Sequence, residues 1–426
     1  MIQPLIFKFG GASIKDADAI KNIAHLVKNR WSNGLVIVIS AAGDTTDTLE
    51  KIIQLASEGK NYTPEWTRLL GYHLEICNDL FEKQHGIFER VTNHFSILKR
   101  TLDTASFKND AGYFYDQAVG FGELISTRIV QELLCAEGFY CLWQDARELV
   151  ATDSSHKMAR VDWALTMQQC RRIVIPKLEK YPVITQGFIG QDLLGNTTTL
   201  GREGSDFTAA ILAVSLGAKS VTIWKDVEGI LNGDPDLFPD AVKFDHLDFE
   251  EAAEMTYYGA KVIHPKTIKP LAKHRIPLFV KSFLKPDAPG TVIGPFPDDP
   301  KLPITVVKNR QLLLTLRIRD LSMVGGFHFE YLYSGMKKLK WNINLLAASA
   351  SNIKVVADAV AYDENLVQKT FRDIFHVTLK KELTLITVKN YREEHYQTYV
   401  HPNRQVWLEQ KSENLLQVVL EESQVP

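Results

Sequence analysis

Short apolar runs alternate with longer segments of helical period along the first two thirds of the chain. The apolar runs predict buried strands at Leu5–Phe9, Leu35–Ser40, Val183–Thr185, Ser220–Trp224 and Leu278–Lys281. Continuous apolar strands separated by helices are typical of a largely parallel sheet covered on both faces. The pattern therefore predicts an α/β domain over residues 1–296.

One stretch of this domain differs from the rest. Residues 48–104 are helical in period and poor in glycine, so we expect a helical insertion beside the sheet. Six prolines then fall between Pro286 and Pro303. Such a density cannot continue a helix or a central strand, so a domain boundary is predicted there.

The pattern changes after this boundary. Residues 304–390 predict a β-α-β-β-α-β order typical of a ferredoxin-like α+β fold. The predicted elements are strands at Gln311–Leu316, Ile343–Ser349, Ile353–Ala359 and Leu383–Val388, with helices at Phe327–Lys340 and Asp363–Ile374. Residues 391–426 predict a partial second unit, with a brief segment at Arg392–Val400 and strands at Gln405–Gln410 and Leu415–Leu420.

Composition narrows the function classes. The net charge is −2, which gives no case for binding nucleic acid or an anionic membrane. No apolar run is long enough to cross a bilayer, and the N-terminus does not have the pattern of a signal peptide. The four cysteines show no metal-ligand spacing. A cytoplasmic protein with reduced thiols is expected.

The turn after the first predicted strand has the chemistry of a phosphate site. Gly10 and Gly11 let the backbone bend sharply and approach a ligand closely. Ser13, with Asp16 three residues later, resembles a capping box, which predicts a helix start at Ser13. Free N–H groups at a helix start attract phosphate, and Lys8 adds an ammonium beside it.

Three further stretches share this chemistry. Ser40–Asp47 follows a strand end, where ligands bind in open α/β sheets. Arg202 stands between glycines and suits two parallel hydrogen bonds to a carboxylate. Lys225 and Asp226 stand in a turn-rich stretch after another strand, which suggests the edge of a nucleotide-binding site. Each stretch alone is also compatible with an ordinary turn or helix cap.

The combination of motifs is more specific than any one of them. K-F-G-G-A-S, S-A-A-G-D-T-T-D, G-F-G-E-L-I-S-T, T-L-G-R-E-G-S-D, K-D-V-E-G-I and G-A-K-V-I-H-P stand in this order. The set resembles the aspartokinases of the amino-acid kinase superfamily over roughly residues 3–294. Residues from 304 onward resemble more loosely an ACT-type regulatory region.

This resemblance implies transfer of the γ-phosphoryl group of ATP, with Mg²⁺ held mainly by the ATP phosphates, to the side-chain carboxylate of L-aspartate. The product is 4-phospho-L-aspartate, the first intermediate toward lysine, threonine and methionine. A carboxylate is already a nucleophile, so positioning and positive charge carry the catalysis. A homodimer or homotetramer formed through the ACT-like region is also implied.

The resemblance assigns roles residue by residue. Lys8 and Asp206 are the catalytic residues, and no metal-binding side chains are expected. Aspartate is bound by Ser40, Thr46, Glu123, Phe188, Arg202 and Ser205, with Arg202 on the α-carboxylate and Glu123 on the α-ammonium group. The nucleotide is bound by Lys8, Gly10, Gly11, Ser13, Lys225, Asp226 and Lys261.

Several positions depart from the family pattern. Ala12 replaces a threonine, Lys225 replaces a threonine, and Leu231 and Asp236 stand where a tyrosine and an arginine are expected. These changes leave open a catalytically weakened regulatory homologue, or a related kinase with another acidic substrate.

The regulatory region departs from the family as well. The acidic lysine-binding positions of the family align with Asn344 and Ala350. Neither residue carries a charge, so weak or absent inhibition by lysine is expected.

Overall fold

The computed structural model describes residues 3–32, 34–104, 110–260, 263–296, 302–320, 322–358, 362–401 and 404–422. It divides into two compact units. The first comprises residues 1–230, 243–253 and 262–297, and the second comprises residues 231–242, 254–261 and 298–426. Two short segments of the predicted kinase region therefore group with the C-terminal unit.

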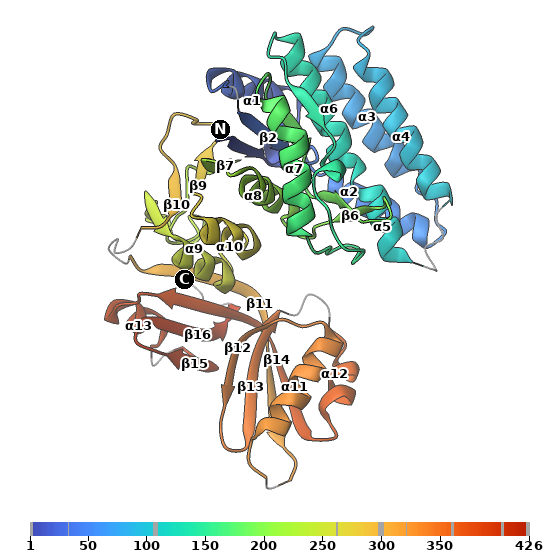
Figure 1. Cartoon of the computed structure of the whole chain (residues 1–426). Helices are drawn as coiled ribbons and strands as arrows, with labels where there is room; N and C mark the ends of the chain where they lie inside the picture. Colours follow the sequence, from blue (N-terminus) through green and yellow to red (C-terminus); the bar gives the residue numbers. More distant parts are fainter. Residues whose placement is uncertain are drawn as a thin grey trace. The chain divides into compact units, whose positions relative to one another are not determined.

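The first unit is built on an eight-stranded sheet (Figure 1). Its order is β3 (Leu142–Gln144), β4 (Val183–Gln186), β2 (Leu35–Ile39), β1 (Leu5–Phe9), β7 (Ser220–Lys225), β9 (Leu278–Ser282), β10 (Thr291–Gly294) and β8 (His246–Asp248). All neighbours pair in parallel except β9 and β10. The predicted α/β class with a largely parallel sheet is confirmed.

Helices cover both faces of this sheet. Phe7 and Phe9 of β1 share a core with α1 (Ala17–Asn29) and α6 (Phe121–Ala136). Helix α8 (Gly204–Leu216) is buried along its whole length and packs against α7 (Trp163–Leu178) and α10 (Pro265–His274). A helix that is apolar all round needs such complete cover.

A further helical layer lies outside α6, as Figure 1 shows for α3 and α4. It consists of α2 (Thr45–Ser57), α3 (Thr63–Leu80), α4 (Ile87–Thr104) and α5 (Ala111–Val119). Buried side chains such as Ile76 and Phe95 join this layer to the same core as α1 and α6. Short elements complete the unit: η2 (Ala146–Glu148), the hairpin β5 (Ile189–Gln191) and β6 (Thr197–Thr199), and the first residues of α9 (Phe249–Tyr258).

The helix start predicted at Ser13 was wrong. Residues Gly11–Ile14 form a 3₁₀ turn in which Ser13 is buried, and α1 begins three residues later. Asp16 is the N-cap, because its carboxylate accepts the backbone N–H of Ala19 at 2.8 Å. The acidic residue expected to close the cap is thus the cap itself.

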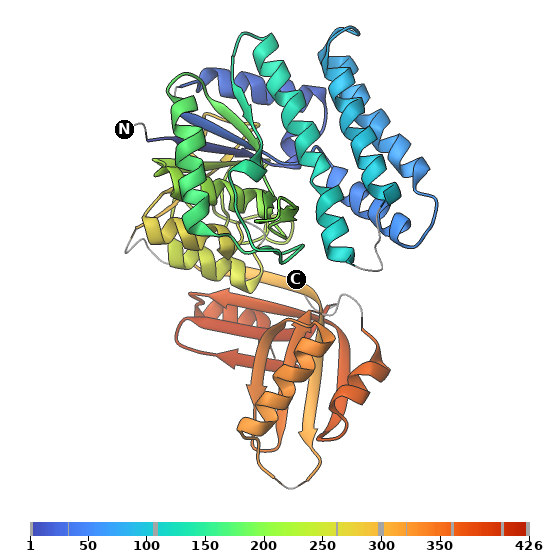
Figure 2. The same cartoon turned by 45° about the vertical axis from the view of Figure 1, so that its right-hand side comes forward.

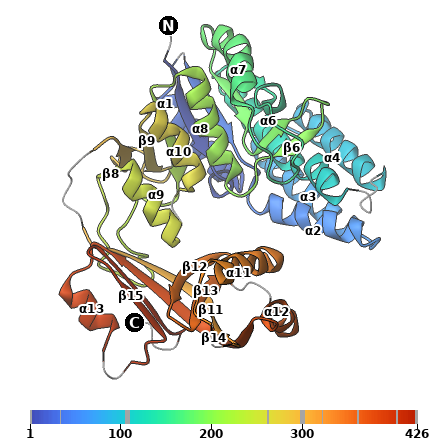
Figure 3. The same cartoon turned by 60° about the horizontal axis from the view of Figure 1, so that its bottom comes forward.

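The second unit contains a six-stranded antiparallel sheet (Figure 2). Its order is β12 (Ile343–Ala348), β13 (Asn352–Asp358), β11 (Ile304–Ile318), β14 (Phe375–Lys389), β16 (Leu415–Glu421) and β15 (Leu408–Lys411). Helices α11 (Gly326–Leu339) and α12 (Glu364–Phe371) share one core with β11, β13 and β14, and Figure 3 shows both beside these strands. This part has the predicted β-α-β-β-α-β order.

Two strands are much longer than predicted. β11 and β14 each contain 15 residues, whereas the sequence pattern marked only Gln311–Leu316 and Leu383–Val388. Their pairing shifts register between Lys308 and Leu313, and Arg310 and Glu382 adopt φ values of 56° and 54° there. Left-handed residues of this kind interrupt a ladder at a bulge.

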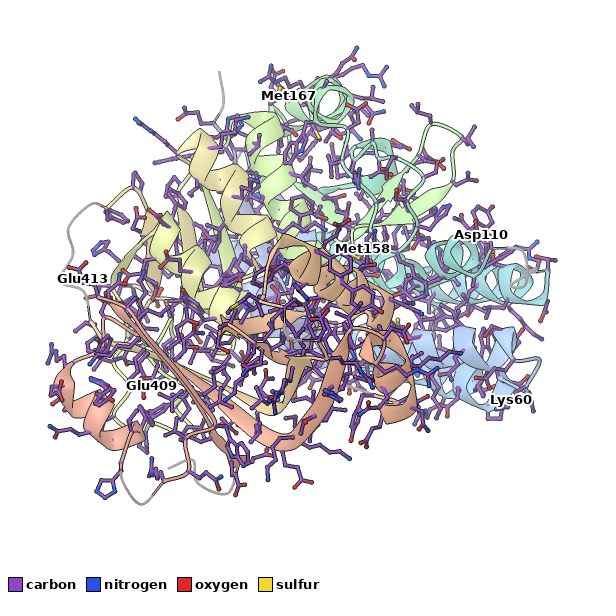
Figure 4. All side chains as sticks on the ribbon, turned by 90° about the horizontal axis from the view of Figure 1, so that it is seen from below. Lys60, Asp110, Met158, Met167, Glu409 and Glu413 are labelled. Carbon is purple, nitrogen blue, oxygen red and sulfur yellow. The ribbon has the colours of Figure 1, made fainter. Side chains whose placement is uncertain are left out.

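The extended halves of these strands form a second lobe. Residues 304–308 pair with 385–389, which in turn pair with β16. Helix α13 (Glu393–Tyr399) shares a separate core with this part of the sheet. The strand predicted at Gln405–Gln410 begins later, at Leu408, and Figure 4 labels Glu409 on it and Glu413 in the turn that follows.

Candidate active site

The parallel strands of the first unit end around one cavity. It has a volume of about 680 Å³ and lies at the carboxyl ends of β1, β2, β4 and β7. The N-termini of α6 and α8 contribute residues to its wall. In open α/β sheets this edge is where ligands bind, and helix N-termini favour anions there.

Nearly every residue singled out from the sequence lines this cavity. The set is Lys8, Gly10, Gly11, Ser13, Ser40, Thr46, Glu123, Phe188, Arg202, Ser205, Asp206, Lys225 and Asp226. Lys261 lies outside the described residues. Five of the six sequence motifs therefore come together, although no cavity dimension could be read from the sequence.

Lys8 and Asp206 form a buried ion pair inside the cavity. The Lys8 Nζ lies 2.6 Å from Asp206 Oδ1, and the two side chains are 10% and 5% exposed. Lys8 comes from β1 and Asp206 from the first turn of α8. A buried ammonium needs such a partner. The pair fixes a positive charge next to the glycine turn.

The glycine turn approaches a second turn backbone to backbone. A Cβ atom at Gly11 would lie 2.9 Å from the carbonyl oxygens of both Ala41 and Gly43. The amide of Gly43 also donates to the carbonyl oxygen of Gly11 at 3.1 Å. A side chain at Gly11 would separate the loops that follow β1 and β2. Glycine is required here by space rather than by its φ angle.

Glu123 is a buried carboxylate with an unsatisfied oxygen. It is 3% exposed, and its Oε2 has no hydrogen-bond partner among the described residues. Burial raises its pKa to about 8, against the opposing effect of nearby backbone amides and of the Lys8 charge. The position is suited to an ammonium group supplied by a ligand.

The loop that carries Arg202 is closely packed against Phe188. A Cβ atom at Gly204 would lie 2.7 Å from the Phe188 ring. The backbone N–H of Phe188 is held by Thr208 Oγ1 at 3.0 Å. Arg202 itself is exposed at the cavity wall. The fixed backbone presents this guanidinium to the cavity.

Another group of lining residues was missed by the sequence analysis. Tyr115 donates its hydroxyl to Glu50 Oε1 at 2.6 Å, and the Lys157 Nζ lies 4.6 Å from the Tyr115 ring centre. Met158, labelled in Figure 4, is 70% exposed and also lines the cavity. Glu50 stands one helical turn after Thr46, which was a usable signal. The loop with Lys157 and Met158 carries no motif.

The G-A-K-V-I-H-P segment has a structural role at its end. His264 is the N-cap of α10, because its Nδ1 accepts the backbone N–H of Lys266 at 3.1 Å. The imidazole of His264 thus has a structural role at the start of this helix.

The cavity offers no separate metal centre among the residues that the structure describes, since no three His, Cys, Asp or Glu side chains cluster there or elsewhere in them. Within the same residues, no helix has the length and apolarity to cross a membrane.

Comparison with known proteins identifies the class. Residues 3–282 match the model of the amino acid kinase family. The chain is 32% identical over 364 residues to lysine-sensitive aspartokinase 3 of Escherichia coli, covering 84% of this chain and 79% of that one. It is 30% identical to the chloroplastic aspartokinase 1 of Arabidopsis thaliana, covering 90% of this chain and 68% of that one.

Solved structures agree with these matches. The structure of E. coli aspartokinase III with aspartate and ADP superposes with a TM-score of 0.84 at 27% identity, covering 99% of this chain and 97% of that one. The chain thus belongs to the amino acid kinase family and, within it, to the aspartokinases. The resemblance drawn from the motifs is confirmed.

Proposed function

We propose that this chain is an aspartate kinase, which transfers the γ-phosphoryl group of ATP to the side-chain carboxylate of L-aspartate and releases 4-phospho-L-aspartate. The relatives named aspartokinase support this reaction. The ADP and aspartate present in the E. coli structure support the same pair of ligands.

The Oε2 atom of Glu123, which has no hydrogen-bond partner among the described residues, is the observation that favours an amino acid as the acceptor of the phosphoryl group. A buried carboxylate that faces the cavity without a partner binds a ligand ammonium group. A nucleoside monophosphate or an N-acylated amino acid lacks this ammonium group. Arg202, on the same cavity wall, takes the α-carboxylate in two parallel hydrogen bonds.

The remaining lining residues divide between acceptor and donor. Ser40, Thr46, Phe188 and Ser205 complete the aspartate side. Gly10, Gly11, Ser13, Lys225 and Asp226 line the nucleotide side, with Lys261 assigned there from the family pattern. Lys8, held by Asp206, stabilises negative charge on the phosphoryl group during transfer.

Mg²⁺ enters this reaction as part of the substrate Mg-ATP, held mainly by the phosphates. Hard cations bind oxygen donors of this type. We assign no side chain of this chain to the ion.

The wider setting is proposed on the same basis. The reaction opens the route to lysine, threonine and methionine, and we place it in the cytoplasm. The C-terminal unit, with its ferredoxin-like sheet, is proposed as the regulatory domain and as the interface of a homodimer or homotetramer. Symmetric pairing of two copies is the commonest form of assembly.

Trapping of the acyl phosphate with hydroxylamine tests the function. Incubation with ATP, Mg²⁺ and L-aspartate should give aspartyl hydroxamate, whereas glutamate and N-acetylglutamate should give no more than background. UMP, whose phosphorylation yields no acyl phosphate, is tested in parallel by release of ADP and should also give no more than background. A preference for one of these acceptors would assign a related kinase. Product from none of them would support a catalytically weakened homologue instead.

A further inference from the structure

Several residues of the cavity wall have a strained backbone conformation. Three residues of its wall, Lys157, Phe188 and Glu203, adopt the left-handed conformation without being glycine. Glu203 has φ 53° and ψ 28° and directly precedes α8. This conformation costs a non-glycine residue free energy, so it persists where surrounding contacts impose it. Glycine would adopt it without that cost.

The side chain of Glu203 makes such a contact. Its Oε2 accepts the backbone N–H of His264 at 2.9 Å, at the start of α10. A second link runs in the other direction, because the Lys266 Nζ donates to the carbonyl oxygen of Leu200 at 2.6 Å. The ends of the loop 200–203 are therefore both attached to the first turn of α10.

The opposite side of the loop is also confined. At Gly201, where φ is 77°, an added Cβ would lie 3.2 Å from the carbonyl oxygen of Lys157 and 3.2 Å from Met158 Cγ. Arg202 lies between Gly201 and Glu203. Its backbone is thus limited by α10 on one side and by residues 157–158 on the other.

We infer that Glu203 is a positioning residue for aspartate binding, which fixes the backbone that presents Arg202. This inference rests on the proposed role of Arg202. A guanidinium grips a carboxylate in two bonds only when its plane is aligned with the ligand. Fixing that plane before the ligand arrives lowers the entropic cost of binding. Nucleotide binding does not use this grip.

Three substitutions of Glu203 separate its hydrogen bond from its backbone strain. Glu203→Gln keeps an oxygen that can accept from His264, so the KM for aspartate should stay within twofold of wild type. Glu203→Ala removes the acceptor and keeps the strain. Glu203→Gly removes the acceptor and relieves the strain, so it should fold at least as well as wild type.

Both Glu203→Ala and Glu203→Gly should raise the KM for aspartate about fivefold, the loss of one hydrogen bond, with the KM for ATP unchanged. Arg275→Gly is the matched control. Arg275 is also left-handed, at φ 54°, but lies at the far end of α10 and does not line the cavity. It should leave both KM values unchanged.

The outcomes distinguish this inference from the role of Arg202. An Arg202→Lys variant measured in parallel should raise the KM for aspartate. If it does so while Glu203→Gly keeps the wild-type value, Glu203 has no positioning role. A Gln variant as impaired as Ala, or equal rises in both KM values, also refutes the inference. An unchanged KM in Arg202→Lys refutes the proposed role of Arg202 itself.

Discussion

Lys8 reaches the cavity from one of the two central strands of the sheet. Its strand β1 lies between β2 and β7, and its ammonium is held at 2.6 Å by Asp206. We predict that Lys8→Met lowers kcat at least 100-fold, since losing one preorganised charge costs about 3 kcal/mol of transition-state stabilisation.

The methionine preserves most of the buried stem of Lys8 but leaves Asp206 unpaired. Circular dichroism and a thermal melt must therefore accompany the kinetics, because an uncompensated buried charge destabilises the fold. A folded variant that retains more than about a tenth of wild-type kcat would exclude Lys8 from catalysis.

Glu123 predicts a pH dependence of substrate binding. With a pKa of about 8, it is mostly protonated in the free enzyme at neutral pH and cannot pair with an ammonium group. The kcat/KM for aspartate should therefore rise as the pH increases from 6.5, reach about half of its maximum near pH 8 and level off above about pH 9. The profile for ATP at saturating aspartate should lack this step, and Glu123→Gln should abolish it.

Ionisation of the Glu123 carboxyl group also makes the stability of the fold depend on pH. Its pKa is raised from an ordinary value of 4.5 to about 8 by folding, so the folded state binds the proton more tightly. The free energy of unfolding should fall as the pH rises from about 4.5 to about 8. In Glu123→Gln this part of the pH dependence should be missing from denaturant titrations.

Residues of the candidate site could be predicted from the sequence where a chemically suitable side chain stands within a recognisable motif. Lys8, Arg202 and Asp206 each lie within two residues of a glycine in one of the motifs, and all three line the cavity. Lys157 and Glu203 could not be predicted, because their left-handed backbone is imposed by tertiary contacts. No local pattern in the sequence records such contacts.

At the scale of elements, strands were predictable where burial makes them apolar throughout. β1, β2, β7 and β9 lie within one or two residues of their predicted ranges. The long strands β11 and β14 were not, because polar and left-handed residues at their bulges interrupt the apolar pattern. The start of the first helix was misplaced for another reason. Ser13 and Asp16 are both residue types that cap helices well, and the packing of the 3₁₀ turn leaves Asp16 as the cap.

The contact between the loops after β1 and β2 predicts the effect of a methyl group at Gly11. Gly11→Ala places a Cβ atom 2.9 Å from two carbonyl oxygens, so the loops must separate. We expect a loss of about 1–3 kcal/mol in the free energy of unfolding and a higher KM for ATP.

Gly71 provides the matched control for this substitution. It lies within α3, and a Cβ there meets no atom within 4 Å. Gly71→Ala should stabilise the protein by up to about 1 kcal/mol and leave both KM values unchanged. Equal stability changes in the two variants would show that space at Gly11 is not limiting.

At the scale of the whole molecule, the C-terminal unit raises the question of feedback. The E. coli relative is named lysine-sensitive, and a structure of it holds lysine and aspartate. In this chain, the resemblance to the family leads us to expect Asn344 at a position where aspartokinases carry an acidic lysine-binding residue. Its side-chain oxygen already accepts the Lys308 Nζ at 2.9 Å.

The amide nitrogen of Asn344 is engaged as well. It donates to Gln311 Oε1 at 2.7 Å and to Asp358 Oδ1 at 2.8 Å. An ammonium of the chain itself thus takes the acceptor that an effector would need, and Ala350 offers no carboxylate. A buried ammonium without an acidic partner binds poorly.

We therefore predict that lysine inhibits this kinase weakly or not at all. An effector shifts activity only if it binds one conformational state better than another. Neither Asn344 nor Ala350 carries an acidic group, and the neighbouring Asp358 carboxylate already accepts hydrogen bonds from the side-chain amides of Gln311 and Asn344. The test is a lysine titration of kinase activity at sub-saturating aspartate, with the E. coli enzyme as a positive control. Half-inhibition below 1 mM, about −4 kcal/mol of binding or tighter, would mean that lysine binds through other residues of this chain.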